Sequence, residues 1–90
     1  MGYEALITLD LPNSTDEQRD KFYEVLAKEK WVKLKTLTTT WTVLFNDGVT
    51  RARCVEILMQ DLKKAKEQSR IYTVAYAIQL DQQSVEVDKL

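Results

Sequence analysis

Asp10 is the residue of this 90-residue chain whose type and place point most directly to chemistry. It stands near the end of an alternating segment, residues 3–11, directly before Leu11 and Pro12. A carboxylate is a ligand that hard cations such as Mg²⁺ or Mn²⁺ accept, because these ions take oxygen ligands and activate water near a phosphate. Aspartate is also common where a strand ends in a turn, so a purely structural role stays open beside the metal-binding one.

Basic and aromatic residues form a second candidate set, for contact with nucleic acid: Trp31, Lys33, Lys35, Arg51 and Arg53. Strand alternation places Lys33 and Lys35 on one face with Trp31, so the lysines would meet phosphates and the indole would stack on a base. Lysine on an edge strand also prevents sheet-to-sheet pairing, which is the alternative explanation. Lys63, Lys64 and Lys66 form a further basic cluster near the end of a predicted helix. The helix dipole favours cations there, so this cluster needs no ligand to explain it.

Composition narrows the chemistry further. The chain has no histidine, so the commonest general base and the commonest transition-metal ligand are both missing. The formal charge of -1 excludes a global basic field. Cys54 is the single cysteine, and without a histidine to activate it we expect a buried structural thiol rather than a nucleophile. No glycine-rich phosphate-binding loop is present.

The charged N-terminal segment does not resemble a signal peptide, and no window approaches the roughly 18 apolar residues of a membrane span. These features predict a cytoplasmic protein without a membrane segment.

Periodicity predicts six elements. Residues 3–11 alternate as a strand, and a helix follows over about residues 15–29, with Ser14 and Glu17 at capping-box spacing. Residues 31–45 read as a tight pair of strands joined by threonines. Asp47 or Thr50 would cap a second helix that extends to about residue 68. Its buried stripe would be Ala52, Val55, Met59, Leu62 and Ala65.

The last strand of the core, residues 71–80, is continuously apolar or small, which suggests burial on both faces. Beyond it, residues 84–87 would suit a short fifth strand. We expect Trp41 to be more buried than Trp31, because Trp41 lies in the middle of a strand.

The order strand, helix, strand, strand, helix, strand predicts an α+β, ferredoxin-like βαββαβ fold, with a four-stranded antiparallel sheet and two helices on one face. Residues 1–82 would form this domain, and residues 83–90 a tail or an exchanged strand. The sheet face opposite the helices would carry Leu6 and Thr8, and an uncovered apolar face normally marks a partner surface. Homodimerisation is the simplest way to cover it.

Several segments carry a resemblance to a known family. The order LITLDLP, KWVKLKTLTTTWTVLF and IYTVAYAIQL, with Asp10, Trp31 and Thr39-Thr40-Trp41, resembles the small CRISPR-associated spacer-acquisition nuclease superfamily. The closest resemblance is to its stand-alone members, which include the GhoS-type antitoxin endoribonucleases. The resemblance implies a homodimer, a C-terminal strand that crosses to the partner, and metal-dependent cleavage by paired aspartates at Asp10.

The chain departs from the pattern of the active nucleases, which place further acidic or basic residues beside that aspartate. Here the neighbours are Leu9, Leu11 and Pro12. The principal hypothesis is therefore an assembly or regulatory binding module without activity of its own. The alternatives are a metal-dependent endonuclease of RNA or DNA in a toxin–antitoxin or CRISPR-like system, and an allosteric small-molecule sensor with a pocket at a dimer interface.

Overall fold

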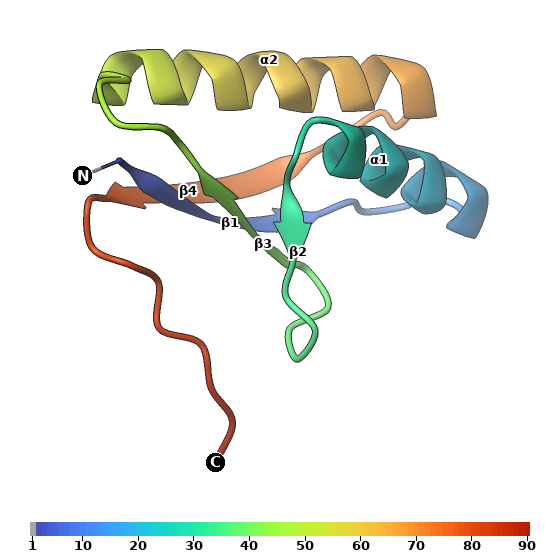
Figure 1. The fold of residues 1–90 in the computed structure, drawn as a ribbon. Helices are drawn as coiled ribbons and strands as arrows, with labels where there is room; N and C mark the ends of the chain where they lie inside the picture. Colours follow the sequence, from blue (N-terminus) through green and yellow to red (C-terminus); the bar gives the residue numbers. More distant parts are fainter. Residues whose placement is uncertain (1) are drawn as a thin grey trace.

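The structure is a computed structural model that describes residues 2–90. Its elements are β1 (Glu4–Asp10), α1 (Asp16–Lys28), β2 (Val32–Lys33), β3 (Thr40–Leu44), α2 (Arg51–Ser69) and β4 (Ala75–Asp81). The strands form one sheet in the order β2-β3-β1-β4, and all neighbouring strands are antiparallel. Both helices lie on the same face of this sheet (Figure 1). The predicted α+β, ferredoxin-like architecture is confirmed.

The core lies between the sheet and the helices. Ala5, Ile7 and Leu9 of β1 are buried, and the register pairs Ala5 with Val43 and Ile7 with Trp41. Directly paired residues share a face, so these side chains all point toward α1 and α2. Phe22, Val25 and Leu26 of α1 are buried against them.

The first helix begins one residue later than the predicted capping box. Thr15 has an extended backbone and its side chain accepts a hydrogen bond from the Gln18 amide, while the Gln18 side chain accepts one from the Thr15 amide. The predicted pair Ser14 and Glu17 is therefore wrong. The Ser14 hydroxyl is engaged elsewhere, because it donates to the Leu11 carbonyl at 2.6 Å.

Thr50 caps α2, as one of the two predicted alternatives, and the helix ends at Ser69. Its buried residues are Cys54, Leu58, Leu62, Ala65 and Ser69. Leu62 and Ala65 were predicted correctly, but Ala52 is exposed, and Val55 and Met59 are only partly buried. The helix face that packs against the sheet contains Cys54 and Leu58 in place of Ala52, Val55 and Met59. The predicted stripe therefore lay partly on the neighbouring side of the helix.

The hairpin is not tight, contrary to the prediction. The β2 strand has only two residues, and residues 34–39 form a loop that projects beyond the sheet (Figure 1). Backbone hydrogen bonds from Leu34 to Thr40 and from Thr40 to Leu37 close this loop. The β-branched threonines favoured extended backbone, but only the two ends of the loop bond to strands, where Leu34 donates to Thr40 of β3 and the Thr39 carbonyl accepts from Leu9 of β1.

The fourth strand is much more exposed than its composition indicated. It begins at Ala75, and only Leu80 is buried, with Ile78 partly so. The strand lies at the edge of the sheet and one of its faces is uncovered, so its apolar run does not reflect burial on both faces. Residues 82–90 form no fifth strand within this chain. The Val85 amide donates instead to the Glu4 carboxylate.

The two tryptophans are equally buried, at 3% exposure each, so the expected ranking is wrong. Trp31 directly follows the end of α1, where its amide donates to the Leu26 carbonyl and its ring turns into the core.

Neither helix of the described chain has the length and apolar content that a membrane span requires.

Candidate functional site

The sheet face opposite the helices has no covering layer (Figure 1). Alternation and pairing place Leu6 and Thr8 of β1 on it, as predicted, beside Thr42 of β3 and Ala77 and Gln79 of β4. Two aliphatic side chains stand out at its periphery, Leu44 at 77% exposure and Val32 at 59%. We call this surface the open face. Its members are Glu4, Leu6, Thr8, Asp10, Val32, Thr40, Thr42, Leu44, Ala75, Ala77, Gln79 and Asp81.

Asp10 lies at one end of the open face. It is exposed, it pairs in register with Ala75, and it lines a shallow hollow together with Thr8 and Ala77. Within residues 2–90, no three acidic or cysteine side chains gather closely enough to hold a metal ion. Asp10 therefore has no two further acidic or cysteine side chains beside it in this part of the chain.

The nucleic-acid candidates are not brought together. Lys33 pairs with Trp41 and so points to the helix side, where its ammonium lies 4.9 Å from the centre of the Tyr23 ring. This is a cation–π contact. Lys35 lies in the 34–39 loop, not on a strand face with Lys33.

Trp31 is in the core rather than on a surface. Its indole N–H donates to the Asp61 carboxylate at 3.0 Å, and its ring is buried. The expectation of an exposed stacking surface at Trp31 is wrong, because the ring packs beneath the helices.

Arg51 and Arg53 are exposed in the first turn of α2. This turn lies at the opposite end of the sheet from the C-terminal end of β1 (Figure 1). Arg53 forms an ion pair with Glu56. The five candidates thus form no single cluster, and their role in binding nucleic acid stays a prediction.

Burial shifts the pKa of two groups, the partly buried Asp61 and the fully buried Cys54. Burial raises the pKa of Asp61, and the hydrogen bond from Trp31 partly opposes this shift. Burial likewise raises the pKa of the Cys54 thiol, which keeps it protonated and unreactive. Cys54 is fully buried in α2, as expected for a structural thiol.

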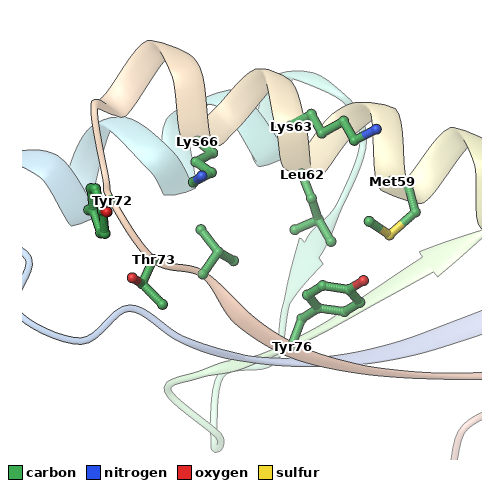
Figure 2. A pocket seen from close by; sticks show the side chains of 8 residues that line it. Met59, Leu62, Lys63, Lys66, Tyr72, Thr73 and Tyr76 are labelled. Carbon is green, nitrogen blue, oxygen red and sulfur yellow. The ribbon is translucent and has the colours of Figure 1, made fainter.

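A pocket that the sequence did not reveal lies between α2 and residues 72–76. It has a volume of about 280 Å³ and is shown in Figure 2. Its lining is Met59, Leu62, Lys63, Lys66, Tyr72, Thr73, Val74 and Tyr76. The feature of the sequence that could have pointed to this pocket is the three-residue spacing of Lys63 and Lys66, which puts both lysines on one side of the helix.

Comparison with known proteins gives the fold alone. No protein-family model matches the chain, and no curated protein matches it either. A similar solved structure is that of protein SP2199 from Streptococcus pneumoniae, at 12% sequence identity and a TM-score of 0.57. The match covers 94% of this chain and 90% of that one. At such low identity the likeness supports the architecture and says nothing about activity.

Proposed function

We propose that this protein is a small cytoplasmic assembly or regulatory binding module that forms a homodimer through its open face. The observation that carries the proposal is the position of both helices on the other face, which leaves this one without a covering layer (Figure 1). Exposed Val32 and Leu44 and the small side chains of Ala75 and Ala77 would pack closely against a second sheet.

The edge of β4 supports the same proposal. This seven-residue strand has no neighbour on its outer side within the described chain, and it contains no lysine, proline or bulge to block pairing. At the other edge of the sheet, β2 has two residues, one of which is Lys33. A segment from a second copy would find a free hydrogen-bonding ladder at β4.

The tail is a suitable segment for this exchange. Val85 and Val87 alternate with Glu86 and Asp88, a pattern that fits a strand with one apolar side. In a single chain the tail pairs with no strand, and Val87 is 46% exposed. Pairing with the partner's β4 would supply hydrogen-bond partners for the backbone of this segment.

Light scattering tests the proposal on the full-length protein and on a chain that ends at Asp81. We expect a full-length dimer at micromolar concentration and a weakened dimer after truncation. A monomeric full-length protein would contradict the proposal. A dimer that truncation leaves intact would restrict the contact to the open face.

The position of Asp10 favours metal-dependent cleavage of RNA or DNA as a second candidate. The carboxylate is exposed on the face that would meet a partner, so a two-fold axis near Ala75 would bring two of them together. Two facing carboxylates resist joint ionisation, and a divalent cation would relieve this repulsion.

The metal candidate is tested by melting the protein with and without Mg²⁺ or Mn²⁺. We expect either ion to raise Tm and Asp10→Asn to abolish both the rise and any cleavage of single-stranded RNA or duplex DNA. Asp20→Asn, an exposed site on α1, is the matched control. No shift with either ion and no cleavage would end this candidate and leave the assembly module.

A further inference from the structure

The pocket between α2 and residues 72–76 is separate from the open face. Tyr76 pairs in register with Leu9, whose side chain is buried beneath the helices, so Tyr76 points to the helix side of the sheet. Figure 2 shows Leu62 and Tyr76 facing each other across the pocket, with Met59 above the ring. Covering the open face would therefore leave this pocket unoccupied.

The inner part of the pocket is apolar and adaptable. Leu62 is 4% exposed, and Val74 and Met59 pack partly buried against the core. Tyr76 is 48% exposed as a residue, and its ring forms one wall of the pocket. An aromatic ring beside a flexible thioether accepts a flat ligand, because both surfaces are polarizable and methionine adjusts its shape.

The rim of the pocket is positively charged. Lys63 and Lys66 are the charged residues of the lining, which contains no carboxylate, although the whole chain carries a formal charge of -1. Neither lysine has an ion pair with any residue in 2–90, whereas the neighbouring Lys64 is paired with Glu29 at 2.7 Å.

The helix dipole explains only part of this charge. Its effect is confined to the last turn, where Lys66 lies. Lys63 is six positions before Ser69 and is beyond that range. The hydroxyls of Tyr72, Thr73 and Tyr76 add hydrogen-bond donors near the lysines.

We propose that this pocket binds a small organic anion with a flat apolar body, such as an aromatic carboxylate or phosphate. The flat body would insert between Met59, Leu62 and Tyr76. The anionic group would remain at the rim, where Lys66 and Lys63 bind it. The volume of about 280 Å³ is near the lower end for ligand pockets, which favours a ligand of one or two rings.

The experiment is an NMR titration of the full-length protein with 2-naphthoate, using naphthalene-2-carboxamide as a neutral analogue of similar shape and 2-naphthyl phosphate as a second anion. We expect saturable shifts at Met59, Leu62, Val74 and Tyr76 with both anions. The carboxamide should bind at least about fivefold more weakly, as the loss of one charge-assisted contact implies.

Single variants show which lysines are needed to bind the anion. Lys66→Ala and Lys63→Ala should each weaken 2-naphthoate binding about fivefold to tenfold. Lys64→Ala is the matched control, since it removes the same charge one residue away and should leave the affinity within about twofold. Equal weakening by Lys64→Ala, equal binding of the carboxamide, or no shifts at these residues would overturn the proposal. A response to a single-stranded oligonucleotide without any response to 2-naphthoate would overturn it as well.

The result is independent of the proposed assembly. Light scattering on the same samples gives the oligomeric state, so a monomer that binds 2-naphthoate would support the pocket and contradict the dimer. A dimer that does not bind 2-naphthoate would support the dimer and contradict the pocket.

Discussion

Two core residues with the same burial can differ in whether their polar atoms have a hydrogen-bond partner. Trp31 and Trp41 are both 3% exposed, but the Trp31 indole N–H donates to Asp61 while the Trp41 indole N–H is buried without an acceptor in the part of the chain that the structure describes. A buried donor without a partner costs free energy, whereas a satisfied one contributes about 1 kcal/mol.

Phenylalanine substitutions should separate these two cases. Trp41→Phe removes an unsatisfied donor, and Trp31→Phe deprives the Asp61 carboxylate of its partner. We expect Trp31→Phe to lower the free energy of unfolding by about 1 kcal/mol more than Trp41→Phe. Both alanine variants should lose about 3–5 kcal/mol, as for other buried large aromatics. Denaturant titrations measure all four, and a larger loss for Trp41→Phe would contradict the hydrogen-bond argument.

The titration of Asp61 gives a second prediction at this scale. Burial raises its pKa in the folded state, so the ionised carboxylate costs stability at neutral pH. This cost disappears as pH falls through the folded pKa toward the unfolded value of about 3.9. Asp61→Asn keeps an acceptor for Trp31 and does not titrate.

The stability of the wild type relative to Asp61→Asn should therefore rise between pH 7 and pH 4. Denaturant titrations at several pH values test this, with Asp61→Ala as a control that loses the acceptor and should be less stable than Asp61→Asn at every pH. A pH-independent difference between wild type and Asp61→Asn would show that the carboxylate is not desolvated.

At the scale of the elements, the ends of both helices depend on residues in the left-handed region. Lys30 has φ 72° and Arg70 has φ 60°, and neither is glycine. The Cβ atom of a residue other than glycine makes the left-handed conformation unfavourable. The same conformation turns the chain sharply, so that the next residues, Trp31 and Ile71, enter the core.

Lys30→Gly should increase the free energy of unfolding by about 0.5–1 kcal/mol, because the relief of strain exceeds the added entropy of the unfolded chain. Ala27→Gly, at an exposed position within α1, should lower it by about 1 kcal/mol. Thermal and denaturant unfolding of the two variants check the contrast. A loss at Lys30→Gly would mean that the lysine stem contributes packing that outweighs the strain.

At the scale of the whole molecule, one layer of helices covers one face of a four-stranded sheet and leaves the other face uncovered. If the open face pairs with a second copy, association contributes to the folded state by mass action. The melting temperature would then depend on protein concentration.

We expect Tm to rise between about 1 and 100 μM for the wild type, on the basis of this linkage. Ala77→Lys, which places a charge on the open face, should remove the dependence and give a monomer. Ala52→Lys introduces the same change on the exposed side of α2 and should preserve it. A Tm independent of concentration in the wild type would contradict assembly through this face.

The order of strands and helices follows from the sequence, because hydrophobic periodicity and capping residues are local. Alternation from Tyr3 to Leu11 predicted the face of β1 that meets the helices, and Thr50 was among the predicted caps. Periodicity was less reliable for α2, where residues on the margin of the stripe looked like core.

Other features depend on which segments meet, and only the tertiary structure decided them. The apolar composition of β4 is the same at an edge as at the centre of a sheet, so its exposure required knowledge of the strand order. Trp31 became core because the chain turns at Lys30, and the pocket exists because α2 crosses residues 72–76. The strand order and the pocket result from packing between separate elements, which a local pattern does not encode. Trp31 is likewise held in the core by a distant partner, because its indole N–H donates to Asp61 of α2.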